Sequence, residues 1–309
     1  YAGVHRSTEY PFFATVLFTI SMCTNTFLNY VLIFGKFGAQ AMGVTGAAAA
    51  TLASRVVEFV VALLYALINR RLPLQAGLVL RPGRRTLRSF MRYSLPVVCN
   101  ETLWSMGLSM LTVIMGHMAN SQDMLAAYAL IGNIDKLSTV VCFGIAAASA
   151  VIIGKEIGMG RDRERVYSVG WTLLVVSLLV GALVMLLLLA LLPLFFRPVL
   201  FRLFKLTAGA AEVAGYLAVV YAVFMPMRAF DVTNITGVLR AGGDVKMAAF
   251  IDNGPLWLAS IPLMALAGLV LNAPTWLVCI AMQAENLCKC PLGLIRFRSG
   301  KWINDITRV

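Results

Sequence analysis

An all-α integral membrane protein with about eight transmembrane helices is the fold that this sequence predicts. Hydrophobic residues make up 60% of the 309 residues and charged residues only 13%, whereas soluble domains have roughly 45–50% and about 25%. The apolar residues gather in blocks that reach the roughly 20 residues needed to cross a bilayer. Within each block the apolar character is continuous and does not alternate, which is typical of helices. The lipid bilayer is therefore the expected environment of most of the chain.

The expected spans are 11–34, 44–68, 93–116, 124–153, 167–194, 211–236, 248–271 and 274–295. They are rich in glycine and alanine, and small residues let membrane helices pack closely. Pro96, Pro226 and Pro262 lie inside spans. Because proline removes a backbone hydrogen bond, we expect these helices to be kinked or broken there.

The connections between spans predict an orientation. Lysine and arginine concentrate in the 69–92, 155–165 and 237–247 connections and in the C-terminal tail, while the alternate loops carry fewer. Because basic loops stay in the cytoplasm, both ends of this chain should be cytoplasmic in a multi-pass cell-membrane protein. The net charge of +12 thus reflects orientation. No nucleic-acid partner is expected, since no basic face with interleaved aromatic residues is visible.

Residues suited to enzyme chemistry are scarce. The six cysteines show no disulfide-scaffold spacing, and only two histidines are present. No zinc motif or phosphate loop is found, because the loop Arg240–Asp244 lacks the Lys-Ser/Thr ending that a phosphate loop requires. The sequence therefore predicts neither an enzyme nor a bound cofactor.

An internal repeat favours a transporter. Ala2–Ser7 precedes the first span and Thr236–Ala241 precedes the seventh, and each leads into two spans of which the second carries an acid, Glu58 or Glu285. Parallel repeats of this kind occur in transporters. Four spans, at roughly 93–236, lie directly before the second copy and after the spans of the first, whereas none precedes the first copy. We therefore expect about four spans to be missing from the N-terminus, with about twelve in the complete protein.

Ionisable residues within spans are costly, and they mark functional candidates. Arg55 and Glu58 are spaced to form an ion pair on one helix, as are Glu285 and Lys289. Both pairs are interpreted as structural, with a role in gating or in packing between helical lobes as the alternative.

Two acids within spans are the leading candidates for binding a coupling cation. Glu101 follows Asn100 and has no base three or four residues away, so it requires another helix, water or a cation. Asp231 is flanked by Arg228, which is close enough to neutralise it, and by Asn234. Glu101 and Asp231 are expected at similar depths, facing one cavity, with Asn100 and Asn234 as supporting ligands.

Three further expectations concern the surroundings of these acids. A helix break at Pro226 should free backbone carbonyls for an ion near Asp231. Asp135 cannot pair with the adjacent Lys136, and it is expected to reach Glu101 or Asp231 as a third cation-coupling residue. Asp252 is interpreted as stabilising a helix end.

Four motifs together resemble the multidrug and toxin extrusion (MATE) family, within the wider multidrug, oligosaccharidyl-lipid and polysaccharide exporter group. They are Gly237-Val-Leu-Arg-Ala-Gly-Gly-Asp244, Asn29-Tyr-Val-Leu-Ile-Phe-Gly35, Gly43-Val-x-Gly-Ala-Ala48 and Val151-Ile-Ile-Gly-Lys-x-x-Gly-x-Gly160. The resemblance covers essentially the whole chain. It implies two six-helix lobes, of which 1–68 would be the last two helices of the N-terminal lobe, 69–92 a cytoplasmic linker and 93–309 the C-terminal lobe.

The resemblance also implies an activity. The chain is expected to be part of a sodium- or proton-coupled antiporter that exports amphipathic organic compounds, with Glu101 and Asp231 in the positions of the family's second-lobe cation site. The complete protein is expected to be monomeric. A lipid-linked oligosaccharide or polysaccharide flippase remains an alternative, as does a membrane-embedded enzyme.

Overall fold

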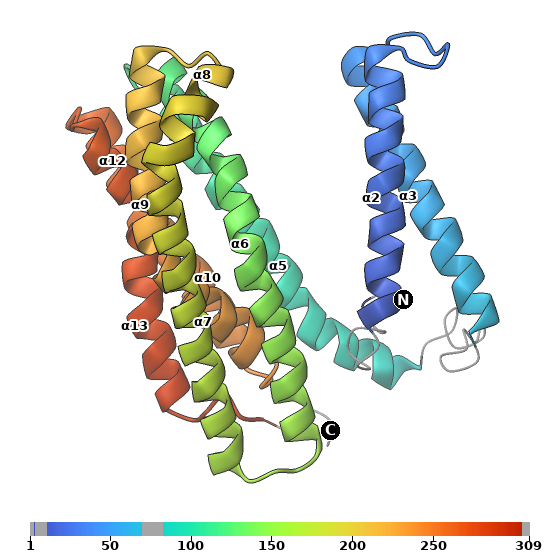
Figure 1. The fold of residues 1–309 in the computed structure, drawn as a ribbon. Helices are drawn as coiled ribbons and strands as arrows, with labels where there is room; N and C mark the ends of the chain where they lie inside the picture. Colours follow the sequence, from blue (N-terminus) through green and yellow to red (C-terminus); the bar gives the residue numbers. More distant parts are fainter. Residues whose placement is uncertain (1–2, 4–10, 70–82, 305–309) are drawn as a thin grey trace. The chain divides into compact units, whose positions relative to one another are not determined.

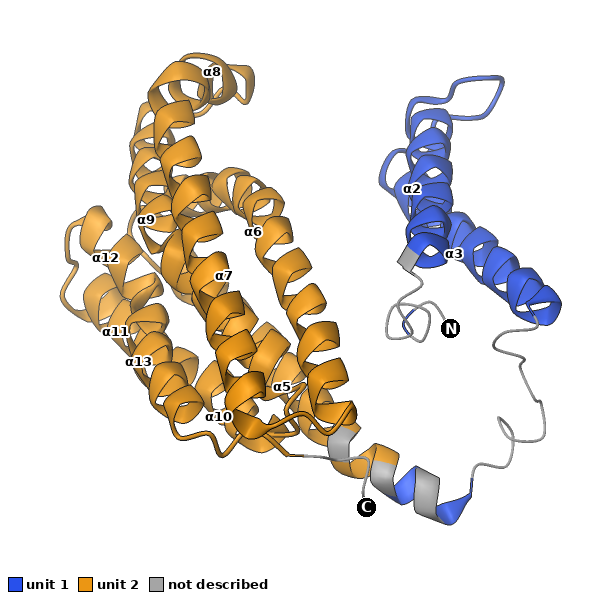
Figure 2. Ribbon diagram, turned by 60° about the horizontal axis from the view of Figure 1, so that its bottom comes forward, with its two compact units in different colours: residues 1–88 blue, residues 89–309 orange. Residues whose placement is uncertain are grey.

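The computed structural model describes residue 3, residues 11–69 and residues 83–304. The chain divides into two compact units, residues 1–88 and residues 89–309, each considered by itself (Figures 1 and 2). The described residues are helical and contain no strand, which confirms the predicted all-α fold. Most of the first repeat copy and the 70–82 part of the basic connection lie outside the described residues.

The first unit contains a helical hairpin. Helices α2 (Pro11–Phe34) and α3 (Gly43–Ile68) pack side by side through small residues. A Cβ on Gly46 would lie 2.6 Å from the carbonyl oxygen of Leu32, so only glycine permits this close approach. Across the hairpin, Asn25 Nδ2 donates to Ser54 Oγ at 3.3 Å. Both predicted spans, 11–34 and 44–68, are confirmed to within a residue.

The second unit is a bundle around α9, with the π-helical segments labelled η. Its elements are α5 (Arg84–Gly116), α6 (Ser121–Gly158), α7 (Arg163–Leu191), η1 (Leu192–Leu200), α8 (Phe201–Leu203), α9 (Ala208–Val232), η2 (Thr233–Leu239), α10 (Val245–Pro255), η3 (Leu256–Ser260), α11 (Ile261–Ala265), η4 (Leu266–Val270), α12 (Thr275–Met282) and α13 (Ala284–Arg298). Helix α5 begins in the first unit.

Small residues explain the central position of α9. It packs against α6, α7, α12 and α13, and it buries Ala214, Ala222 and Ala229 completely. On α7, a Cβ on Gly181 would lie 2.7 Å from the Cβ of Ala229, so glycine lets these two helices approach closely. The result is a helix with 12 buried residues among its 25, which makes it suited to carry a polar site.

The last predicted span is corrected by the structure. Seven helical stretches in the described residues are long and apolar enough to cross a membrane, but 274–295 is split at Gln283 into α12 and α13. Side chains replace the missing backbone bonds. Asn286 Nδ2 donates to the Gln283 side chain at 2.8 Å, and Ser260 Oγ accepts from the Glu285 backbone N–H at 2.8 Å.

The predicted helix break at Pro226 is also wrong. Helix α9 continues through Pro226 to Val232, because neighbouring turns hold a membrane helix together around one missing bond. The irregularity comes later, where the backbone widens into the π-helical segment η2 at Thr233. Such segments are frequent at functional sites, and η2 begins two residues after Asp231.

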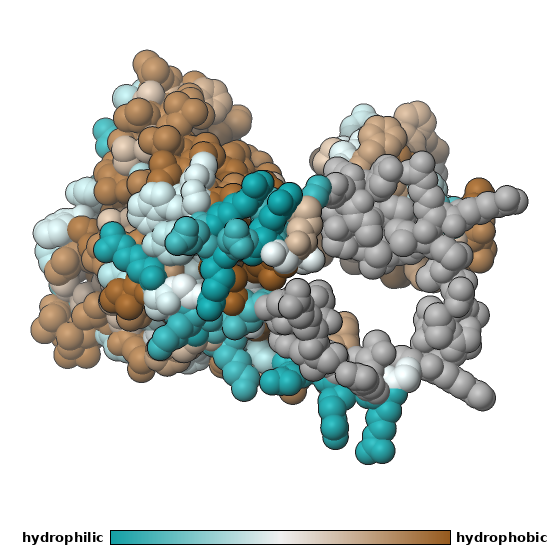
Figure 3. Space-filling view, turned by 90° about the horizontal axis from the view of Figure 1, so that it is seen from below, coloured by the Kyte–Doolittle hydropathy of each residue, from teal (hydrophilic) through white to brown (hydrophobic). Residues whose placement is uncertain are grey.

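The loops of the second unit gather at two opposite ends. At one end, which we call the basic end, Arg163 Nη2 donates to the Gly300 carbonyl at 3.2 Å, and the Asn304 backbone N–H donates to the Gly242 carbonyl at 2.9 Å. At the other end, Thr207 Oγ1 donates to Asp123 Oδ1 at 2.6 Å. The segments rich in basic residues thus lie together, and Figure 3 shows hydrophilic side chains gathered at that end with apolar side chains beside them.

Candidate ion-coupling site

Asp231 is the most deeply buried acid among the described residues. It lies near the end of α9, its residue surface is only 4% exposed, and neither carboxylate oxygen has a hydrogen-bond partner in the described part of the protein. Arg228, which the sequence placed close enough to neutralise it, bonds to a different acid. The structure therefore surrounds Asp231 with protein and gives it no direct counter-charge.

Asn234 lies near Asp231 on the same chain, one turn further along. Its side chain is fully buried, and both its nitrogen and its oxygen have no partner among the described residues. It faces α13, where a Cβ on Gly293 would lie 2.7 Å from Asn234 Nδ2. Lys289 and Glu285 of the same helix lie close enough to Asp231 to act on it electrostatically. Both residues thus have buried side-chain atoms without partners in the described part of the chain, and a role for Asn234 as a supporting ligand stays a prediction.

Lys289 is a buried basic residue that acts electrostatically on Asp231. Its Nζ lies 3.0 Å from Glu285 Oε2 and 3.3 Å from Asp252 Oδ1. The Glu285–Lys289 ion pair is the one that their spacing predicts. Because the ammonium is already shared between two carboxylates, its charge is offset before Asp231 is counted.

The role expected for Asp252 was wrong. Instead of stabilising a helix end, it accepts a hydrogen bond from Asn100 Nδ2 at 2.8 Å and pairs with Arg240 Nη2 at 3.4 Å as well as with Lys289. Asn100 also accepts a bond from Asn253 Nδ2 at 2.6 Å. The side-chain amide of Asn100 therefore forms hydrogen bonds that join α5 to α10. The structure does not place Asn100 as a ligand beside Asp231.

Glu101 finds its partner far away in the sequence. Arg240 Nη1 donates to Glu101 Oε1 at 2.9 Å, and the Glu101 side chain is 56% exposed. Glu101 and Asp231 thus differ in burial and in pairing, and the acid that acts electrostatically on Asp231 from α10 is Asp252. Sequence reasoning missed Arg240 as a partner, although the loop that carries it was the strongest motif.

The charges of this network do not balance. Its described acids are Glu101, Asp231, Asp252 and Glu285, and its bases are Lys289 and Arg240. Four carboxylates therefore share two permanent positive charges.

Asp135 belongs to a separate pair, which corrects its expected place beside Glu101 or Asp231. Arg228 donates to both Asp135 oxygens, with Nη2 at 3.0 Å from Oδ2. The guanidinium also lies 5.6 Å from the ring centroid of Tyr221. This ion pair joins α6 to α9, and it satisfies both charges without any ligand.

The pair in the first unit is formed as predicted. Arg55 Nη1 lies 2.5 Å from Glu58 Oε2, which also accepts a bond from Ser21 Oγ at 2.8 Å. Glu58 therefore joins α2 to α3. A gating or lobe-packing role for this pair and for Glu285–Lys289 stays a prediction.

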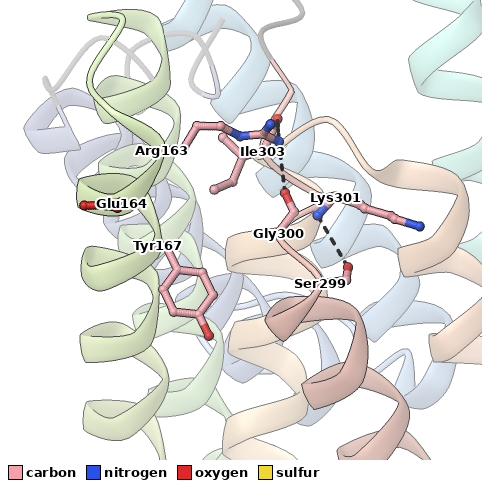
Figure 4. A pocket seen from close by; sticks show the side chains of 7 residues that line it. All are labelled: Arg163, Glu164, Tyr167, Ser299, Gly300, Lys301 and Ile303. Atoms are coloured by element: carbon pink, nitrogen blue, oxygen red, sulfur yellow. Dashed lines mark hydrogen bonds between the residues drawn. The ribbon is translucent and has the colours of Figure 1, made fainter.

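A cavity of about 410 Å³ opens at the basic end (Figure 4). It is lined by Arg163, Glu164, Tyr167, Ser299, Gly300, Lys301 and Ile303. Arg163 reaches across it to two backbone carbonyls. None of the intramembrane acids lines this cavity, so it is distinct from the network around Asp231.

Comparisons with known proteins agree on one family. The MatE family profile matches residues 96–266. A probable multidrug resistance protein NorM from Thermotoga maritima is 30% identical over 283 residues, which are 90% of this chain and 58% of the relative. The chain therefore spans somewhat more than half the length of this curated relative.

Solved structures share the fold. An outward-facing multidrug resistance MATE family transporter superposes with a TM-score of 0.81 at 18% identity, covering 96% of this chain and 65% of that one. The MATE transporter ClbM in complex with Rb⁺ superposes with a TM-score of 0.72 at 16% identity, covering 96% of this chain and 64% of that one. With its family profile, its relatives and its helical bundle in agreement, the chain belongs to the MatE family, the multidrug and toxin extrusion family of membrane transporters.

Proposed function

We propose that this chain forms the C-terminal lobe, and the last two helices of the N-terminal lobe, of a cation-coupled antiporter that exports amphipathic organic compounds by alternating access. Asp231 is the residue that takes up the coupling ion, with Asn234 beside it. The observation that carries the proposal is the burial of both Asp231 oxygens without a partner among the described residues. The names of relatives, which include multidrug resistance proteins, support drug export.

The physical argument rests on the cost of a buried charge. A carboxylate in the interior of a membrane protein is expensive unless a cation or a proton neutralises it. At Asp231 the neighbouring ammonium of Lys289 is shared with two other acids. Ion uptake therefore lowers the energy of the lobe in which Asp231 is shielded from water, and this linkage can couple ion movement to a change in access.

One solved structure with the same fold contains a bound monovalent cation. The ClbM structure contains Rb⁺, which shows that a protein of this fold binds such an ion. Sodium would need oxygen ligands besides Asp231, for which the Asn234 side-chain oxygen is available. A proton would need only the carboxylate.

Separate ion gradients test the proposal. The natural full-length protein, reconstituted in vesicles, should move a fluorescent organic cation only when a sodium or a proton gradient is imposed, and dissipating that gradient should stop transport. The measurement is dye movement under each gradient alone, with protein-free vesicles as the control. Transport at the same rate without either gradient would contradict ion coupling.

The basic end of the second unit should face the cytoplasm, because arginine-rich loops are retained there. We expect an impermeant thiol reagent added outside cells to label Gln122→Cys, at the opposite end, and not Arg161→Cys in the basic α6–α7 turn. Both sites are exposed, and both variants are made in a background that lacks the six native cysteines. Permeabilised cells, in which both should react, are the control. Labelling of Arg161→Cys alone in intact cells would reverse the orientation.

A further inference from the structure

Three exposed basic side chains lie at the end of the bundle opposite the basic end. They are Arg197 in η1, Arg202 in α8 and Lys205 just after it. In the described residues none of the three forms an ion pair or a side-chain hydrogen bond. Cations are normally scarce on one side of a membrane protein. A cluster of unpaired cations on the side with few basic residues therefore indicates a ligand-binding site.

These side chains surround a cavity of about 410 Å³, which is within the usual size of ligand sites. Its other lining residues are Phe201, Leu206, Ala211 and Glu212. Arg197 is held over α9, since its Nη2 would lie 3.3 Å from a Cβ on Gly215. The acid, Glu212, accepts a hydrogen bond from Tyr216 at 2.8 Å. Three positive charges and one negative charge leave a net charge of +2, which fits an anion.

The length of the preceding helix places this cavity at the membrane surface. The helical stretch Arg163–Leu203 contains 41 residues, which at about 1.5 Å per residue is roughly 60 Å. A bilayer with its headgroups is about 40–45 Å thick. The stretch begins in the basic end, so its last turns, which carry Arg197 and Arg202, reach the opposite headgroup layer. Figures 1 and 2 show α8 at that end of the bundle.

Apolar side chains stand beside the cations. The strongly exposed ones in this segment are Leu194, Phe195, Val199, Leu203 and Phe204. Exposed leucine and phenylalanine next to arginine and lysine are the composition of helices that lie in a membrane interface. The apolar group would enter the acyl chains, while the cations meet the phosphates above them.

We propose that Arg197, Arg202 and Lys205 form a binding site for the headgroup of an anionic phospholipid in the leaflet opposite the basic end. The lipid phosphate meets the cations in the cavity, and its acyl chains lie along Leu203 and Phe204. The inference rests on the charge, the cavity and the apolar side chains, and it does not depend on ion coupling at Asp231.

A local fluorescence measurement tests the site. A fluorophore is attached to Val199→Cys, an exposed position in η1, in a background without native cysteines, and the natural full-length protein is reconstituted with brominated phosphatidylglycerol or brominated phosphatidylcholine of the same acyl chains. The relative quenching gives the preference for the anionic lipid at this position. We expect a clear preference that Arg197→Gln/Arg202→Gln/Lys205→Gln lowers on the order of 100-fold, since each basic residue near an anionic surface contributes about a factor of five.

Two controls make the result decisive. The matched triple variant Arg161→Gln/Arg298→Gln/Lys301→Gln removes three exposed cations from the basic end and should leave the preference unchanged. Inorganic phosphate at millimolar concentration should not abolish it, because the lipid is also held by its acyl chains. Equal quenching by the two lipids in the parent chain would overturn the proposal, as would equal loss in both triple variants. Complete competition by inorganic phosphate would assign the cavity to a free anion instead of a lipid.

Discussion

Replacing Asp231 with asparagine should abolish ion-driven efflux by the natural full-length protein. The substitution keeps the size of the side chain and removes the negative charge proposed to hold the coupling ion. Because Asp231 is buried without a bonded partner in the described residues, losing the charge should not destabilise the fold. We therefore expect transport to fall to the level of protein-free vesicles, while the melting temperature stays equal to that of the parent or rises.

Efflux of a fluorescent organic cation from vesicles with an imposed gradient is the measurement, together with thermal unfolding of each variant in detergent. Asp162→Asn is the matched control, since that aspartate is exposed in the α6–α7 turn. Glu101→Gln is the informative comparison. Because Glu101 is 56% exposed and bonded to Arg240, it should retain part of the efflux. Full gradient-driven efflux by a folded Asp231→Asn variant would exclude Asp231 as the coupling residue.

Local features of the site were predictable because helix geometry fixes them. Residues three or four apart lie on one face, so the ion pairs Arg55–Glu58 and Glu285–Lys289 could be read from spacing alone. Hydropathy likewise located seven of the long helices. It failed at the last span, because a mean over apolar residues hides a short polar run. The helix is split at Gln283, whose side chain accepts a hydrogen bond from Asn286, and those polar residue types were the available signal.

Contacts between distant helices were not predictable from one sequence. Arg240 lies 139 residues from Glu101, and nothing in the local pattern indicates that its loop reaches α5. The same limit explains why neutralisation of Asp231 by Arg228 was left open as an alternative. On α9 the two are three residues apart, yet Arg228 turns to Asp135 on α6, which lets it donate to both carboxylate oxygens. A bidentate ion pair of this kind is stronger than a single hydrogen bond.

The Asp135–Arg228 ion pair leads to the second prediction with a large expected effect, namely that Arg228→Met lowers the stability of the protein. The substitution preserves much of the apolar stem but leaves the Asp135 carboxylate, whose side chain is only 17% exposed, without its partner. Breaking a buried ion pair on one side typically costs about 3–5 kcal/mol. We expect a decrease of about that size in the free energy of unfolding, measured by denaturant titration in detergent micelles. Arg165→Met is the control, because Arg165 is 57% exposed in its pair with Glu156 and exposed pairs contribute less than about 1 kcal/mol.

The double variant Asp135→Asn/Arg228→Met separates a structural role from a coupling role for Asp135. With both charges removed, no uncompensated carboxylate remains, so most of the stability lost in Arg228→Met should return. If the pair serves only to join α6 to α9, this folded double variant should also retain gradient-driven efflux. A double variant that is as stable as the parent but cannot transport would show that Asp135 takes part in coupling. A double variant no more stable than Arg228→Met would contradict the pairing itself, because the cost of the single substitution would then come from lost packing around Tyr221 and not from an isolated charge.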